Sequence, residues 1–296
     1  MTKTMENGII LKGIGGFYYV LTPSGTIVES KARGRFRREK IVPMVGDRVS
    51  LSQGKEGFAQ IDEILPRKNM LTRPPVSNVD QLLLVIAAVP QTNLATVDAI
   101  IAAAENKGIE PILLFNKCDL DDLTPLQGLY LAAGFKTLSI SCEKNIGLDA
   151  VQALYAGKTS VFCGASGVGK SSILNQTMMQ GLMPVGTISD RIDRGRHTTR
   201  HVELFAAPNG GFIADTPGFS AFDIESGDPI LKNDLAFLFR EFAPHQHACR
   251  FTGCSHTGEP DCAVLQAVED GQIAKSRYDS YCAMYDQVKN RKEWEK

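Results

Sequence analysis

The sequence lacks a hydrophobic run long enough to cross a membrane. Its longest apolar stretch, 82–89, ends at Pro90, whereas a membrane-spanning helix needs about 20 apolar residues. The N-terminal residues, MTKTMENGII, also lack the positive and then apolar pattern of an export signal. These two absences argue against a membrane role and predict a protein of the cytoplasm.

An excess of charge of one sign is also missing, because 32 Lys and Arg stand against 33 Asp and Glu. The 296 residues are 43% hydrophobic, which is enough apolar material for two or three domains. In a reducing cytosol the chain's cysteines are expected to be thiols or metal ligands rather than disulfides. Nothing in the sequence indicates a second subunit, so we expect a monomer.

A glycine-rich segment, GASGVGKS at 164–171, matches the phosphate-binding template G-x-x-x-x-G-K-[ST]. A β-branched run at 159–163 precedes it, and a helix-compatible stretch at 170–179 follows it. Glycines let backbone N–H groups converge on phosphate oxygens, and the helix N-terminus adds its positive dipole end. Lys170 would neutralise the β- and γ-phosphates, and the Ser171 hydroxyl would ligate Mg²⁺. The predicted nucleotide contacts of this segment are Gly164, Ala165, Ser166, Gly167, Val168, Gly169, Lys170, Ser171 and Ser172.

A second motif, NKCD at 116–119, ends the apolar run 111–115. Such a run is typical of a central parallel strand, and ligands of open α/β sheets bind beyond the carboxyl ends of these strands. The Asp119 carboxylate can accept hydrogen bonds from the N1–H and 2-amino groups of guanine, which adenine does not offer. Lys117 would lie along the base, and Asn116 would tie this loop to the phosphate loop. The motif therefore predicts GTP or GDP as the ligand and argues against an ATP-dependent enzyme.

The order of these two motifs is unusual. In an ordinary guanine-nucleotide-binding domain the phosphate loop opens the domain and NKxD follows far downstream. Here NKCD comes first, which indicates a circularly permuted GTPase. Segments that are distant and inverted along the chain must then converge to form one pocket.

Two further segments extend the predicted nucleotide site. Ser141 and Cys142 follow an apolar strand at 137–140 and resemble the loop whose backbone N–H meets the guanine O6. The motif DTPG ends another apolar strand, so that Asp215 would hold Mg²⁺ through water and the Gly218 N–H would sense the γ-phosphate.

A polar stretch, 184–200, stands between the phosphate-loop helix and the next strand, where the first switch loop belongs. It contains the segment GRHTTR at 195–200. One threonine there should complete the Mg²⁺ shell when the γ-phosphate is present. By analogy with related G-T-T-R segments, Thr199 is favoured over Thr198.

Residues 1–72 differ from the rest of the chain in pattern and charge. Short β-like runs separated by turn residues predict a small all-β barrel. The segment has 12 Lys and Arg against 7 Asp and Glu, and six of the ten residues in 31–40 are basic. Such a loop can pair with backbone phosphates while Phe36 offers a stacking face, a combination suited to RNA. A solvated charged loop is the alternative.

From residue 73 to about 228, apolar strands alternate with helix-like stretches, which predicts a parallel-sheet domain. A buried strand is expected at 81–88 and a helix at 94–107. The proline-containing linker at 73–78 is expected to be a stiff connection.

The C-terminal region, 229–296, is expected to be helical at 230–242, 263–269 and 276–291. The tyrosines of the last helix share one face with Val288, and this face is predicted to be core rather than a base-stacking platform.

Four soft metal ligands stand between these helices. Thiolates and an imidazole at this spacing can close a tetrahedral shell around one structural Zn²⁺, with no open position for catalysis. Independent free cysteines are the alternative, and His245 and His247 are competing ligands. The remaining cysteines stand in apolar contexts and are expected to be packing residues. The predicted zinc ligands are Cys249, Cys254, His256 and Cys262.

Taken together, the motifs NKCD, SCEK, GASGVGKS, GRHTTR and DTPG, in this order, resemble the small-subunit-dependent GTPases of bacteria, the RsgA family, also called YjeQ or YloQ. The resemblance extends over nearly the whole chain. It implies an OB-fold at 1–72 that binds ribosomal RNA, a permuted GTPase domain at 73–228, and a zinc-binding helical domain at 229–296 with His256 as the histidine ligand. It also implies a GTPase that binds the immature small (30S) ribosomal subunit late in its maturation, hydrolyses GTP when stimulated by it, and leaves when maturation is complete.

Hydrolysis requires a group that orients the attacking water. Many GTPases use a glutamine just after the DxxG glycine, but here that position holds Phe219, which cannot hydrogen-bond. The nearest polar candidate is His197, and the resemblance implies that a histidine there serves the water.

Two hypotheses remain at this point. The rival to the GTPase is an RNA-binding assembly module in which GTP is a bound ligand and turnover is incidental, and Phe219 makes it worth testing. A separate hypothesis is that loss of the γ-phosphate contact at Gly218 reorients the zinc domain, because DTPG leads almost directly into that domain.

Overall fold

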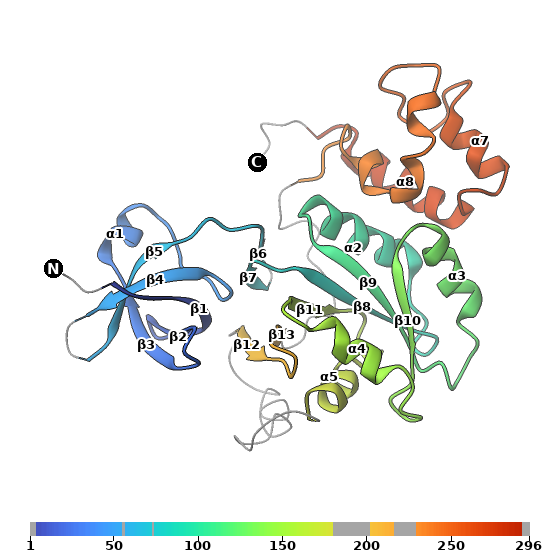
Figure 1. The fold of residues 1–296 in the computed structure, drawn as a ribbon. Helices are drawn as coiled ribbons and strands as arrows, with labels where there is room; N and C mark the ends of the chain where they lie inside the picture. Colours follow the sequence, from blue (N-terminus) through green and yellow to red (C-terminus); the bar gives the residue numbers. More distant parts are fainter. Residues whose placement is uncertain (1–3, 55–56, 73, 180–201, 216–228, 292–296) are drawn as a thin grey trace. The chain divides into compact units, whose positions relative to one another are not determined.

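The computed structural model of the chain describes residues 4–54, 57–72, 74–179, 202–215 and 229–291 (Figure 1). By their contacts these residues fall into two units. The first unit comprises 1–82, 149–162 and 171–219, and the second comprises 83–148, 163–170 and 220–296.

The N-terminal strands of the first unit close into a small barrel (Figure 1). Strand β1 pairs with β2 and β4, β3 pairs with β2 and β5, and β5 pairs with β4, so the strands form a ring. The predicted barrel is confirmed, and its order with a helix between β3 and β4 is OB-like. Its strands are β1 (Thr4–Ile14), β2 (Phe17–Leu21), β3 (Ile27–Ala32), β4 (Arg48–Gln53) and β5 (Ala59–Ile64).

The basic segment of the barrel is helical rather than a loop. Helix α1 (Gly34–Arg38) turns Phe36 inward, where it is 4% exposed and belongs to the barrel core. The expectation that Phe36 offers a stacking face is therefore wrong, because burial of its ring removes a large apolar area from water. Arg37, Arg38 and Lys40 remain exposed.

A short hairpin follows the barrel, formed by β6 (Met70–Thr72) and β7 (Pro75–Ser77). The proline-containing linker thus contributes a strand. The carboxylate of Asp47, which is buried, accepts hydrogen bonds from Arg67 Nε (2.7 Å) and the Ser77 hydroxyl (2.7 Å). This shared carboxylate fixes the hairpin to the barrel within the first unit.

The first unit also contains three further strands outside the barrel. Strands β11 (Thr159–Cys163) and β13 (Phe212–Asp215) are parallel, and β12 (Glu203–Ala206) runs antiparallel to β13. Strand β1 of the barrel pairs with β12 where Lys12 lies opposite Glu203, and these two side chains form an ion pair of 3.4 Å. Barrel and sheet are therefore joined through one strand.

The second unit has its own strands in the order β10-β9-β8, of which β9 and β10 are parallel. Every residue of β8 is buried, which is typical of a strand covered on both faces. The Asn93 side chain caps α2 by accepting hydrogen bonds from the N–H groups of Ala95 and Thr96. The elements are β8 (Gln81–Ala87), α2 (Leu94–Asn106), β9 (Glu110–Asn116), α3 (Thr124–Ala132) and β10 (Lys136–Ile140).

The C-terminal region of the second unit contains short helical elements. The predicted helices near 263–269 and 276–291 are confirmed, but a continuous helix at 230–242 is wrong. Phe239 has an extended backbone, which divides the segment and lets both Phe239 and Phe242 reach the core. No helix in the described ranges is long and apolar enough to span a bilayer. The elements are η1 (Leu235–Leu238), η2 (Arg240–Phe242), η3 (Gln246–Ala248), α7 (Ala263–Glu269) and α8 (Lys275–Val288).

A buried arginine joins α8 to α2 inside the second unit. Arg277 is 1% exposed and donates to Asp98 of α2 (2.7 Å) and, through Nε, to Glu241 (2.7 Å). The Tyr130 hydroxyl of α3 also donates to Asp98 (2.9 Å). Because buried charges are tolerated only when they are paired, this network requires all of its members.

Candidate functional site

The phosphate loop connects β11 to α5 (Lys170–Met179) in a conformation that needs glycine. Gly164, Gly167 and Gly169 have φ values of 142°, 80° and 100°. A Cβ on Gly164 would collide with the Val85 carbonyl oxygen, and one on Gly169 would collide with the Asn116 side chain. The loop is therefore shaped by close approach of β8 and β9, as a cradle of backbone N–H groups requires.

Lys170 lies over the phosphate loop. Its Nζ donates to the carbonyl oxygens of Gly164 (2.6 Å) and Ala165 (2.8 Å). Burial lowers the pKa of Lys170, because a half-buried ammonium loses hydration. An anion beside this ammonium would restore the lost solvation, so the position is suited to phosphate.

The NKCD motif stands directly beside the phosphate loop. Asn116 ends β9, and its Nδ2 donates to the Val168 carbonyl (2.8 Å), which is the tie expected from the sequence. Lys117 Nζ donates to the Gly167 carbonyl (2.8 Å) and to the Val89 carbonyl (2.5 Å). Two motifs in inverted order along the chain thus meet at one place.

The Ser141 loop adjoins the NKCD loop. The Cys118 N–H donates to the Ile140 carbonyl (3.1 Å), and the buried Ser141 hydroxyl accepts from the Lys144 N–H (3.1 Å). Burial raises the pKa of Cys142, and the nearby Asp119 carboxylate raises it further. Asp119 itself is exposed, so the carboxylate predicted to recognise guanine is open to a ligand beside Cys142.

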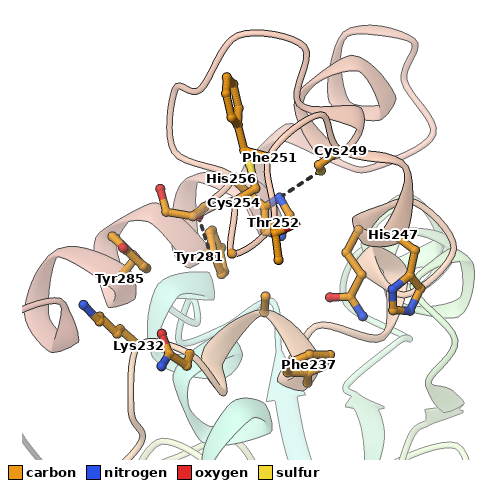
Figure 2. A pocket seen from close by; sticks show the side chains of 15 residues that line it. Lys232, Phe237, His247, Cys249, Phe251, Thr252, Cys254, His256, Tyr281 and Tyr285 are labelled. Atoms are coloured by element: carbon orange, nitrogen blue, oxygen red, sulfur yellow. Dashed lines mark hydrogen bonds between the residues drawn. The ribbon is translucent and has the colours of Figure 1, made fainter.

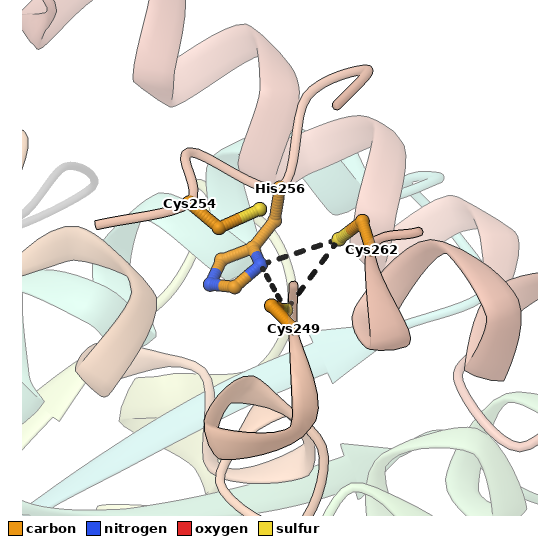
Figure 3. Close-up of side chains that lie close together, drawn as sticks. All are labelled: Cys249, Cys254, His256 and Cys262. Atoms are coloured by element: carbon orange, nitrogen blue, oxygen red, sulfur yellow. Dashed lines mark hydrogen bonds between the residues drawn. The ribbon is translucent and has the colours of Figure 1, made fainter. Parts of the chain in front are cut away.

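The C-terminal region brings the four predicted metal ligands together (Figure 3). Cys249 Sγ lies 3.5 Å from His256 Nδ1 and 3.9 Å from Cys262 Sγ, and the latter two atoms are 3.4 Å apart. With Cys254 included, all four ligand atoms lie within 4.8 Å of one another. Usual zinc bond lengths imply separations of about 3.5–3.8 Å between tetrahedral ligand atoms, so this donor set fits Zn²⁺. His245 and His247 are not part of the cluster.

A carboxylate and two tyrosines hold the loop that carries the cluster. The Glu259 carboxylate accepts from the Ser255 N–H (2.7 Å), and hydrogen bonds of this kind overcome the opposing effect of burial and lower the pKa of Glu259 to about 2. From α8, the hydroxyls of Tyr278 and Tyr281 donate to the backbone carbonyls of His256 (2.9 Å) and Ser255 (2.7 Å). The sequence analysis placed the tyrosines on a core face but missed these hydrogen bonds.

Comparison with known proteins decides the family. A model described as RsgA GTPase matches residues 64–225, and one described as RsgA N-terminal domain matches residues 7–61. A small ribosomal subunit biogenesis GTPase RsgA from Ruminiclostridium cellulolyticum is 44% identical over 292 residues, which cover 97% of this chain and 95% of the relative. The chain belongs to the RsgA GTPase family.

A further relative and two solved structures support the same family. The RsgA of Caldanaerobacter subterraneus subsp. tengcongensis is 43% identical, with 96% of each chain covered. The crystal structure of YloQ, a circularly permuted GTPase, superposes with a TM-score of 0.81 at 36% identity and covers 97% of this chain and 96% of YloQ. YjeQ from Thermotoga maritima also gives 0.81, at 32% identity, covering 97% of this chain and 99% of YjeQ. This RsgA-family chain is therefore a circularly permuted GTPase that hydrolyses GTP.

The described residues include only part of the predicted RsgA-family site. His197, Thr199 and Gly218 lie outside the described residues. Ser171 and Ser172 are exposed in the first turn of α5, and Asp215 is the last residue of β13. Within the described loops, the structure brings together the residues predicted to contact the guanine base and those predicted to contact the phosphates. As a member of this family the chain uses GTP, GDP and Mg²⁺.

Proposed function

We propose that this RsgA-family GTPase binds the immature small ribosomal subunit, hydrolyses GTP when stimulated by it, and leaves when the subunit's maturation is complete. The proposal depends most on two hydrogen bonds between the NKCD motif and the phosphate loop. Asn116 donates to the Val168 carbonyl, and Lys117 donates to the Gly167 carbonyl. These bonds support a guanine-nucleotide pocket built from permuted segments. The names of the relatives, small ribosomal subunit biogenesis GTPases, support the partner.

The decisive experiment measures GTP turnover by the purified protein with and without small ribosomal subunits. Strong acceleration by the subunits is expected. The rival function, an RNA-binding assembly module with incidental turnover, draws its support from Phe219 in place of a polar residue. That rival requires phosphate release to stay unchanged when subunits are added, although the protein still binds them.

In the proposed mechanism the backbone of 164–169 and Lys170 hold the phosphates, while Asp119, Ser141 and Cys142 recognise the base. Ser171 and Thr199 would ligate Mg²⁺, whose charge offsets that developing on the transferred phosphoryl group. Asp215 would support this ion through water, and the Gly218 N–H would contact the γ-phosphate.

We expect His197→Ala to lower turnover by about 100-fold or more while GTP affinity stays nearly intact, because the side chain is proposed to position water rather than nucleotide. Single-turnover hydrolysis and nucleotide titration measure the two quantities separately. His201→Ala, a change to a nearby histidine, is the matched control and should retain turnover. An unchanged rate of GTP hydrolysis in His197→Ala would show that His197 does not position the attacking water.

The barrel is proposed to hold ribosomal RNA through the exposed basic residues Arg37, Arg38 and Lys40. In the described chain none of them has an acidic side chain as its partner, whereas Arg33 is engaged by Asp62 (2.6 Å). Phosphate contacts release counterions, so their number sets the salt dependence of affinity.

Arg37→Gln should therefore weaken binding to small subunits and reduce the salt slope of log affinity by about one. Sedimentation or filter binding across a salt series measures the slope. Basal GTP turnover is expected to stay unchanged, and Lys158→Gln in the other part of the first unit is the control for loss of one charge. An identical slope in Arg37→Gln and the unaltered protein would contradict the RNA contact.

Cys249, Cys254, His256 and Cys262 are proposed to bind one structural Zn²⁺. Burial raises the pKa of the Cys254 thiol, so this thiol carries its proton when no metal is bound. Zinc binding must then release protons, and zinc affinity should rise with pH.

Competition with a chromophoric chelator between pH 6 and 8 is expected to show tighter zinc binding at the higher pH. Cys262→Ser should remove the metal, whereas Cys282→Ser, a change to a cysteine outside the cluster, should keep one zinc per chain by elemental analysis. Equal zinc content in the two variants would contradict the proposed ligand set.

The domain organisation is proposed to follow these functions. Residues 1–72 form the RNA-binding OB-fold, 73–228 the permuted GTPase domain, and 229–296 the zinc-binding domain. We further propose that the protein acts as a monomer in the cytoplasm, where small subunits mature.

A further inference from the structure

One row of residues crosses five strands of the first unit, and each member lies directly opposite the next in the strand register. Its members are Asp215 on β13, Glu203 on β12, Lys12 on β1, Tyr19 on β2 and Glu29 on β3. The last three strands belong to the barrel, whereas β13 ends at the aspartate of the DTPG motif. The row therefore connects the proposed RNA-binding barrel with the residue predicted to hold Mg²⁺. We refer to it as the cross-strand row.

Lys12 joins the two parts of the cross-strand row through its side chain. Its ammonium forms an ion pair with Glu203 (3.4 Å) and lies over the Tyr19 ring, 4.9 Å from the ring centre. Side chains that lie opposite each other in antiparallel strands are neighbours on one face of a sheet, so both contacts follow from the register. Lys12 thus contacts one residue of the barrel and one residue outside it.

A bulge in β1 precedes Lys12. The register of β1 with β2 shifts between Ile10 and Lys12, so that Leu11 has no partner on β2. A bulge bends a strand and increases its twist. This bend accounts for a barrel strand that meets β12, a strand outside the barrel, at Lys12.

Packing alone does not fix the junction between β1 and β12. A cavity of about 270 Å³ lies beside it, lined in part by Gly13, Ile14 and Val202. A larger cavity, of about 470 Å³, lies beside the proposed zinc ligands of the second unit (Figure 2), and its described lining residues are different ones. Because the junction is incompletely filled, the ion pair between Lys12 and Glu203 is placed to decide how β1 and β12 lie against each other.

Strands β12 and β13 are held together more firmly. Residues Glu203–Ala206 of β12 pair along their whole length with Phe212–Asp215 of β13. Leu204, opposite Ala214, is 2% exposed, and Ala214 is 1% exposed. A restraint on β12 therefore acts also on the backbone at the Asp215 end of β13.

We propose that Lys12 and Glu203 are positioning residues for subunit-stimulated GTP hydrolysis. A subunit that binds the barrel restrains β1, the ion pair passes this restraint to β12, and β12 passes it to the backbone of Asp215. Fixing a residue that holds Mg²⁺ accelerates the reaction, because the site then needs less reorganisation in the transition state. The inference rests on the proposed function, since the stimulation comes from the small subunit, and it names how the stimulation reaches the site.

The first test exchanges the two charges of the ion pair. GTP turnover by the full-length protein is measured over a series of small-subunit concentrations, and the acceleration is the ratio of the saturated rate to the basal rate. Lys12→Glu places like charges opposite each other and should lower the acceleration by about 5-fold or more, at an unchanged half-saturating concentration of subunits. The double variant, Lys12→Glu with Glu203→Lys, restores the attraction and should recover the acceleration.

A second ion pair of the first unit provides the matched control. Lys68, which is exposed, pairs with Asp80 (3.1 Å), and neither residue belongs to the cross-strand row. Lys68→Glu makes the same change of charge and should keep the full acceleration. Surface pairs contribute little to stability, so all of these variants are expected to fold.

Three outcomes of the first test would overturn the inference. One is full acceleration in Lys12→Glu, and another is an equal loss in Lys68→Glu, which would indicate a general effect of charge. The third is a double variant as impaired as Lys12→Glu. If the half-saturating concentration of subunits has then also risen, Lys12 binds an RNA phosphate directly instead of acting through Glu203.

Hydrogen exchange separates this inference from the proposed function. In the free protein the amides of 203–206 should exchange about 2- to 5-fold faster in Lys12→Glu, the change that an ordinary surface ion pair allows, and at the original rate in the double variant. If subunits do not accelerate turnover by the unaltered protein, the proposed function fails, while the exchange rates still report whether the pair couples β1 to β12. If subunits accelerate turnover equally in the unaltered protein and in Lys12→Glu, only the inference about the ion pair fails.

Discussion

Replacing Asp119 with alanine should weaken GDP binding by about 100- to 10,000-fold, because two charge-assisted hydrogen bonds to guanine are lost, each worth about 1.5–3 kcal/mol. Asp119 is exposed and lies beside Cys142, in a loop whose Asn116 and Lys117 contact the phosphate loop. Removing the carboxylate should leave those contacts intact. Calorimetric titration with GDP measures the loss directly.

The controls for this prediction test base recognition. Asp121→Ala removes an exposed carboxylate two residues away and should bind GDP normally. Asp119→Asn should shift preference toward xanthosine diphosphate, because an amide can donate to the carbonyl that xanthine carries in place of the 2-amino group. If Asp119→Ala retains full GDP affinity, the permuted segments do not form the pocket described above.

Replacing Arg277 with alanine should lower the free energy of unfolding by about 3–5 kcal/mol, because two buried carboxylates lose their common partner. Asp98 is 1% exposed, and Glu241 is paired to the same guanidinium. The hydrogen bond from Tyr130 would remain on Asp98, but it carries no charge. Urea unfolding followed by a signal from the second unit measures the change.

A surface pair provides the contrast for this change. Arg250→Ala breaks the exposed ion pair with Asp261 (2.8 Å) and should cost about 0–1 kcal/mol. A triple change of Arg277→Met with Asp98→Asn and Glu241→Gln should recover much of the loss, because no unpaired charge is then buried. Equal stability of Arg277→Ala and Arg250→Ala would mean that the buried network contributes no more than the surface pair.

The parts of this protein that sequence analysis predicted well depend on local chemistry. The glycines at 164, 167 and 169 are required by positive φ, and the strand at 159–163 and the helix at 170–179 agree with the structure. Motif order alone predicted the permuted fold, because a phosphate loop needs NKxD beside it wherever that motif stands in the chain. The close spacing of Cys249, Cys254, His256 and Cys262 along the chain likewise predicted that they form one cluster.

The parts that it missed depend on contacts between distant segments. Phe36 stands among arginines and looks exposed in the sequence, but the barrel core is completed by its ring. The periodicity of 230–242 suggested one helix, yet the core formed with Tyr281 favours two short turns around Phe239. Nothing near Arg277 in the sequence points to Asp98, and both residues look like ordinary solvated charges.

Arg277 and Asp98 are separated by 179 residues along the chain. During synthesis Asp98 is made well before its partner, which arrives with α8. Until then, the interior side of α2 carries a carboxylate that cannot be buried without penalty. The second unit can therefore bury this carboxylate with its partner only after α8 has been synthesised, and a chain that stops before Arg277 would keep an unneutralised Asp98 in that core.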